Sequence, residues 1–178
     1  MAKTYTADHL LRALRESAEC NDLLSTLQQL SVDLNQMIHT FVALQQCAPS
    51  PSNTGYTAYL ESCLLHVRNL ITFFHNLEFE KITIRDFVPG ERWIDATQAP
   101  DLAPVRDVID QYLVAGNGYW LIDSASQFDQ ILCSAVVELA DAFQSFMDLL
   151  PAGSTVKEFM ENSTRVALGK LDLSVGGR

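Results

Sequence analysis

The chain has little positive charge and few cysteines for its 178 residues. It holds 12 Lys and Arg residues against 22 Asp and Glu residues, which gives a formal net charge of −10. A general affinity for nucleic acid is therefore disfavoured, because proteins of that class neutralise phosphates with Lys and Arg, although a local basic patch can still exist. No CxxC spacing occurs, so we expect reduced thiols and no structural disulfide among the four cysteines, which are Cys20, Cys47, Cys63 and Cys133.

Long apolar runs and targeting signals are also missing. No apolar run reaches the ~18 residues that a membrane-spanning helix needs, so we expect no membrane partner. The first twenty residues contain no signal-peptide core, and a cytoplasmic location is the resulting expectation. No glycine-rich nucleotide-binding loop stands between a strand pattern and a long helix pattern, and we expect no cofactor.

Apolar residues at helical spacing are what the chain has in quantity. Hydrophobic residues make up 48% of the sequence, enough for the core of one domain. Their three-then-four spacing predicts helices over residues 7–46, 54–77, 105–113 and 127–150. We expect an all-α fold, an antiparallel bundle of four to five main helices within one domain of residues 1–152. Residues 153–178 should form a weak helix over 156–168 and a flexible tail.

Several details follow from capping and turn chemistry. Asn21 and Asp22 favour helix ends over helix interiors, so we expect the first long helical pattern to break or kink there. Asn53 or Thr54 can cap the second helix. Residues 78–101 lose the helical period and should form a long connection with a short strand-like or one-turn helical piece. The inner faces of the two strongest helices predict a shared core of Val67, Leu70, Phe74, Leu132, Leu139 and Phe143.

Three residues on the polar strip of the second helix are candidates for chemistry: Arg68, Asn69 and His75. Arg68 and His75 are two helical turns apart, so they share a side of the helix to within ~20° and start ~10 Å apart along its axis. An Arg can grip a phosphate through two donors, and a His changes charge near neutrality. The alternative interpretation is structural, with Arg68 paired to Glu61 or to an acidic loop residue and His75 packed against Phe79.

The same three residues resemble the motif of the HEPN superfamily, an Arg followed by a polar residue and, after four to six residues in all, by a His. The segments YLESCLLHVRNLITFF and RDFVPGERW and the capped final helix are similar to an uncharacterised group of bacterial HEPN-like proteins, over about residues 56–150. The resemblance implies a homodimeric, metal-independent ribonuclease or RNA-sensing protein in a toxin or phage-defence setting. It also implies that Arg68 and His75 of both subunits line one cleft, with Asn69 at most orienting a partner group.

Two other functions remain open. The acidic composition favours a non-catalytic helical module that keeps the HEPN scaffold and binds a protein partner. A metal site of His39, His66 and His75 would resemble the His-bearing bundles of the DinB family, but His66 projects away from His75 and no ExxH or HxxxH pair occurs. We therefore expect no metal, and we expect His66 to pack among aromatic side chains near Tyr59 and Phe73.

Overall fold

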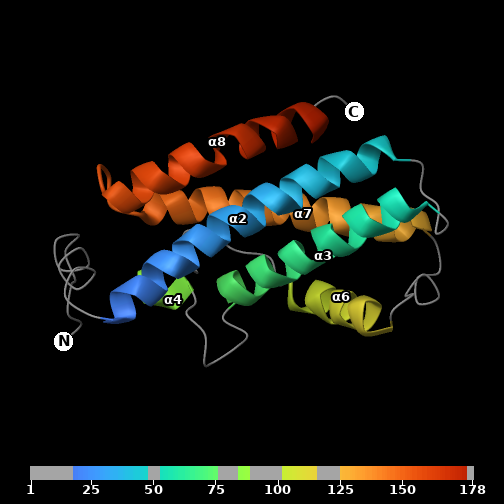
Figure 1. Ribbon diagram of the computed structural model, residues 1–178, viewed down its shortest axis with the longest axis horizontal. Helices are drawn as coiled ribbons and strands as arrows, with labels where there is room; N and C mark the ends of the chain where they lie inside the picture. Colours follow the sequence, from blue (N-terminus) through green and yellow to red (C-terminus); the bar gives the residue numbers. More distant parts are fainter. Residues whose placement is uncertain (1–17, 48–52, 76–83, 89–101, 116–124, 176–178) are drawn as a thin grey trace.

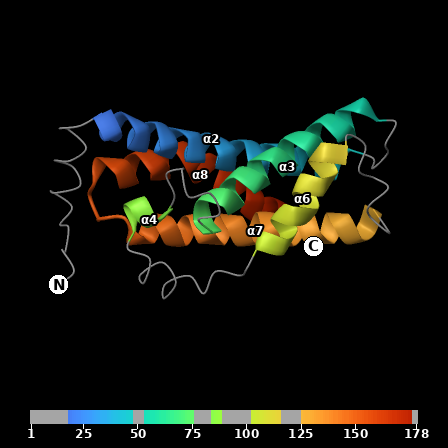
Figure 2. The same cartoon turned by 90° about the horizontal axis from the view of Figure 1, so that it is seen from below.

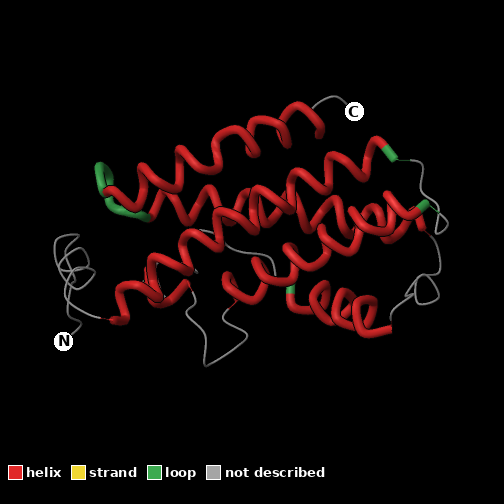
Figure 3. Tube along the Cα trace, viewed as in Figure 1, coloured by secondary structure: helices red, strands yellow, loops and turns green. Residues whose placement is uncertain are grey.

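The described part of the chain is all-helical, as the apolar spacing predicted. The computed structural model describes residues 18–47, 53–75, 84–88, 102–115 and 125–175, and within these residues it contains helices and short turns but no strand (Figures 1 and 3). The helices are α2 (Ala18–Gln46), α3 (Thr54–His75), α4 (Ile84–Phe87), α6 (Ala103–Ala115), α7 (Ala125–Leu149) and α8 (Thr155–Val175). None of the described helices combines the length and the hydropathy needed to cross a bilayer.

Helix α3 has main contacts with four other described helices, α2, α4, α6 and α7. Helix α2 packs most extensively against α3 and then against α8, while α6 lies against another flank of α3. Seen from below, α7 runs along the side of the molecule away from α2, and α4 lies near one end of α7 (Figure 2). This arrangement gives α3 two polar flanks with different neighbours, one facing α2 and one facing α6.

The apolar side chains of α3 and α7 form a common core, as predicted. Val67, Leu70 and Phe74 are buried in the same cluster as Leu132, Leu139 and Phe143. Within that cluster the rings of Phe73, Phe74, Phe87, Phe143 and Phe146 meet mostly edge to face, with centroid distances from 5.2 to 6.4 Å. Edge-to-face contact is favourable for aromatic rings, so this cluster fixes how α3, α4 and α7 pack.

Two helix starts have the caps that their sequences indicate. The Asn53 side-chain oxygen accepts hydrogen bonds from the amides of Gly55 (3.1 Å) and Tyr56 (3.3 Å), which confirms one of the two predicted caps of α3. Between α7 and α8, Gly153 has a φ of 70°, a conformation that costs glycine little. The next residue, Ser154, accepts a bond from the amide of Lys157 (3.2 Å) and so caps α8.

Helix α2 does not break where the sequence suggested. It begins at Ala18 and continues through Asn21 and Asp22 to Gln46, so the predicted break is wrong. The low helix propensity of Asn and Asp amounts to only ~0.7 kcal/mol per residue or less, which tertiary packing commonly outweighs. The predicted helical residues before Ala18 lie outside the described part of the chain.

The C-terminal helix is longer than predicted. It runs to Val175, beyond the predicted end at Leu168, and includes residues 171–175 of the segment that was expected to be a flexible tail. Its inner side is buried, including Met160, Thr164, Ala167 and Leu171. The Ser31 hydroxyl donates to the Ser163 hydroxyl (2.7 Å), and the Asn35 amide donates to the Ser163 carbonyl oxygen (2.9 Å). These contacts hold the middle of α8 against α2, and the buried side chain of Leu171 continues the packing beyond the predicted end at Leu168.

The connection after α3 is only partly described. Its one-turn helical piece is α4, and Val88 next to it is buried while Phe87 packs on the core. Ile84 is buried as well, so the one-turn helical alternative is confirmed for residues 84–87, which pack on the core. Residues 76–83 and 89–101 of the connection lie outside the described part of the chain.

Candidate functional site

Arg68 lies on the flank of α3 that faces α6. Its Nε donates to Oδ1 of Asp110 on α6, and both side chains are about one-third exposed, at 33% and 35%. The acidic partner is therefore neither Glu61 nor a residue of the connection, the two alternatives that the sequence offered. The structural interpretation of Arg68 as an ion-paired residue is realised, but with a helix 42 positions later in the sequence.

A second arginine approaches the same carboxylate. Arg106, four residues before Asp110 on α6, places its Nε 3.5 Å from Asp110 Oδ2 and is only 17% exposed. Two guanidinium groups from different helices thus share one carboxylate, each at its own oxygen. Sequence reasoning missed Arg106 because nothing in its local pattern separates it from an ordinary surface residue of a short helix.

Asn69 points to the other flank of α3. Its side-chain amide donates to Oδ1 of Asp33 on α2 (3.2 Å), so the structure does not bring Asn69 together with Arg68. The expected 100° turn between adjacent helical residues accounts for this separation. His75 is the last residue of α3, and its side chain lies outside the described part of the protein.

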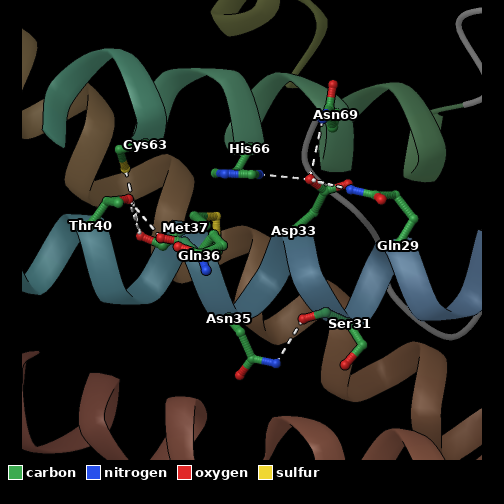
Figure 4. A network of polar contacts seen from close by, with 10 residues as sticks. All are labelled: Gln29, Ser31, Asp33, Asn35, Gln36, Met37, Thr40, Cys63, His66 and Asn69. Atoms are coloured by element: carbon green, nitrogen blue, oxygen red, sulfur yellow. Dashed lines mark hydrogen bonds and ion pairs between the residues drawn. The ribbon is translucent and has the colours of Figure 1, made fainter. Parts of the chain in front are cut away.

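Asp33 is the centre of a polar cluster at the α2–α3 contact (Figure 4). Its side chain is 5% exposed, and Oδ1 also lies 2.7 Å from His66 Nδ1 and accepts a bond from the Gln29 amide at 3.3 Å. A buried carboxylate needs such donors, because an unpaired buried charge is costly. His66 is thus held by a carboxylate. The sequence did not predict this contact, since it placed the ring near Tyr59 and Phe73 and named no acidic partner for it.

Asp33 was not singled out from the sequence, although a signal existed. It stands between Leu30, Leu34 and Met37 in the inner stripe of α2, where an acidic residue is out of place. Such a residue calls for a partner on the neighbouring helix. Identifying His66 and Asn69 as the partners requires the packing of the two helices, which the local pattern of α2 does not contain.

The cysteine and histidine side chains that are described do not form a reactive centre. Burial raises the pKa of the Cys63 thiol to about 12, so its nucleophilic thiolate is disfavoured. Cys47, Cys63 and Cys133 are free thiols, and His39 is exposed on α2. Over the described ranges no three His, Cys, Asp or Glu side chains are grouped so that they could hold a metal ion.

No protein family, curated protein or solved structure matches this chain. The HEPN resemblance therefore remains a prediction that rests on the motif residues and the segments around them.

Proposed function

We propose that the protein is a HEPN-type RNA-cleaving or RNA-sensing protein that acts as a homodimer through Arg68 and His75. The observation that carries this proposal is the meeting of Arg68 and Arg106 at one carboxylate on the α3–α6 contact. In a chain with a formal net charge of −10, two guanidinium groups that converge on one point offer donors that a phosphate can use.

The order of contacts along α2 and α3 supports the antiparallel bundle that this proposal includes. Asp33 meets His66 and Asn69, whereas Met37, further along α2, meets Cys63, which is earlier in α3. Two neighbouring helices whose contacts run in opposite order along the sequence are antiparallel. The same order supports one element of a HEPN-like scaffold, and the rest of that scaffold is part of the proposal.

In the proposed reaction Arg68 holds the scissile phosphate and His75 moves the proton. The RNA 2′-oxygen forms a bond to phosphorus while the bond from phosphorus to the 5′-oxygen breaks. One His75 accepts the proton of the 2′-hydroxyl, and the His75 of the second copy gives a proton to the leaving 5′-oxygen. Two copies are needed because Arg68 and His75 start ~10 Å apart along α3, too far for one copy to clamp a single phosphate well. The toxin or phage-defence setting belongs to the same proposal.

A second candidate is a non-catalytic helical module that binds a protein partner. Specific contacts favour it, because Asn69 is engaged by Asp33 and Arg68 by Asp110 within the chain itself. In this role both polar residues of α3 serve the packing of the helices, and the acidic surface repels RNA.

Cleavage of single-stranded RNA by substituted proteins separates the two candidates. Under the leading proposal Arg68→Ala and His75→Ala each abolish cleavage and cellular toxicity, and a metal chelator leaves both intact. Loss of the partly exposed Arg68 ion pair costs at most about 1 kcal/mol, so that variant stays folded. His39→Ala, which removes an exposed histidine from α2, is the matched control and keeps full activity.

The outcome that contradicts the leading proposal is equally concrete. If the wild-type protein is a monomer at micromolar concentration and cleaves no RNA, the non-catalytic role replaces it. The same holds if Arg68→Ala or His75→Ala unfolds the protein, since the pair would then be a packing feature of the bundle.

A further inference from the structure

We propose that Arg68 and Arg106 together form a phosphate-binding site. Without RNA the carboxylate of Asp110 occupies this site, and an RNA phosphate displaces the carboxylate when it binds. This inference rests on the proposed function. It adds Arg106 as a residue that binds RNA and Asp110 as a side chain of the protein that competes with the RNA phosphate. It concerns the α3–α6 contact alone, and it does not depend on where the His75 side chain lies.

The geometry of the contact sets the roles of the three side chains. Asp110 presents Oδ1 to Arg68 and Oδ2 to Arg106, so one carboxylate spans two guanidinium groups. Arg106 and Asp110 stand four residues apart on α6 and therefore stay neighbours on one helix face, while Arg68 reaches across from α3. A phosphate group, which also offers several oxygens, can bridge the same two donors.

The charges favour exchange of the carboxylate for a phosphate. The two arginines and Asp110 together carry a net charge of +1, and the two arginines with a phosphodiester in place of the carboxylate carry the same charge, so the exchange conserves the charge of the site and frees Asp110 to turn outward into water. Two ion pairs have to be broken, the partly exposed pair of Arg68 with Asp110 and the longer pair of Arg106 with Asp110 at 3.5 Å, and ion pairs that are partly exposed to water are weak. Exposed Glu61 on α3 and Asp107 on α6 keep the surroundings acidic, so binding should be weak while Asp110 is ionised.

Other described cations do not form a comparable pair. Lys157, Arg165 and Lys170 are all on α8, and Lys157 pairs with Glu161 on its own helix at 3.9 Å. Among the described side chains, only the α3–α6 contact joins cations from two helices at one point. That convergence is the reason to assign the phosphate site there instead of to the charged surface of α8.

The test measures binding of a short 2′-O-methyl single-stranded oligoribonucleotide, which cannot be cleaved, by fluorescence anisotropy. Asp110→Asn should tighten binding about two- to fivefold, the range that corresponds to removing an ion pair worth up to ~1 kcal/mol. Asp107→Asn removes the same charge from an exposed position one turn away and is the matched control, with a smaller gain. Arg106→Gln should weaken binding and lower the salt dependence by about 0.7 in the logarithmic slope, as expected for one lost phosphate contact to a single strand.

Inorganic phosphate serves as the second probe. It should compete with the oligoribonucleotide, and more effectively against Asp110→Asn than against Asp107→Asn. Equal effects of the two substitutions would mean a general charge effect and would overturn the inference. Undetectable binding in every variant would overturn it as well, and so would RNA binding that Arg106→Gln leaves unchanged.

These results are distinguishable from failure of the ribonuclease proposal. If binding follows the expected order but no RNA is cleaved, the phosphate site stands and the cleavage proposal fails. If cleavage depends on Arg68 and His75 while Asp110→Asn binds no better than Asp107→Asn, the cleavage proposal stands and the role of Asp110 as internal occupant is refuted.

Discussion

Replacement of Phe74 by alanine tests whether α3 is the structural centre of the bundle. The side chain is 3% exposed, and its ring meets three others edge to face, at 5.2 Å from Phe73, 6.4 Å from Phe143 and 6.3 Å from Phe146. The substitution therefore removes contacts within α3 and contacts between α3 and α7.

The magnitude follows from burial and from the ring contacts. A Phe→Ala substitution in a core costs ~3–5 kcal/mol, which includes the lost transfer free energy and the cavity that remains. Favourable edge-to-face pairs contribute ~0.5–1.5 kcal/mol beyond their buried area. With three such neighbours, Phe74→Ala should lie in the upper half of the range, at about 4–5 kcal/mol.

Urea denaturation followed by far-ultraviolet circular dichroism measures this loss. Phe159, which is 44% exposed on α8, provides the matched control, and Phe159→Ala should change the free energy of unfolding by only about 0.5 kcal/mol. The denaturant dependence of both variants should stay that of the wild type, because the surface exposed on unfolding is nearly the same. A loss below ~1 kcal/mol for Phe74→Ala, or equal losses for the two variants, would refute the central position of α3.

Two further predictions concern buried polar groups. Asp33→Ala should lower the free energy of unfolding by at least about 2 kcal/mol, since the donors of His66, Asn69 and Gln29 lose their acceptor. Asp33→Asn keeps an acceptor and should lower it clearly less. Equal losses of the two variants in denaturation experiments would contradict the role of the carboxylate. Burial raises the pKa of Cys63 to about 12 from 9.0, so its thiol ionises in the unfolded chain before it does in the folded protein. The unfolded state then binds fewer protons, and this thiol should lower stability by up to about 1.4 kcal/mol per pH unit as the pH rises from 9.0 toward 12. Cys63→Ala should remove that slope in stability measurements at different pH, and an unchanged slope would exclude the thiol as its source.

The sequence was most informative where apolar spacing is long and regular. The stripes of α3 and α7 identified Val67, Phe74, Leu139 and Phe143 as core residues because each helix has to bury a continuous apolar side. The predicted break in α2 failed because local preferences of Asn and Asp are weak compared with the burial of Leu27 and the residues after it. Similarly, the end of α8 was missed because Gly169, Lys170 and Asp172 interrupt the apolar spacing, although Leu171 between them is buried.

For the candidate site, the sequence predicted only the directions in which the side chains leave α3. Helical geometry alone indicates that Arg68 and Asn69 point to different neighbours, and the structure shows this. Their partners Asp110 and Asp33 are 42 and 36 positions away, so they depend on how the helices pack and cannot be found from local patterns. For Arg68 the sequence offered Glu61, an acid on the same helix, whereas packing brings α6 to that flank.

The buried carboxylate of Asp33 restricts how α2 and α3 can slide along one another. In the observed register it meets His66 and Asn69, which both offer hydrogen atoms. A slip of one helical turn in one direction would replace these residues by Leu70 and Phe73, and burial of a charge against two apolar side chains is strongly unfavourable. The leucine-rich stripe alone would tolerate such slips, because its apolar positions repeat every three to four residues. A single acid inside that stripe thus selects one alignment of the two helices from several that would bury similar apolar area.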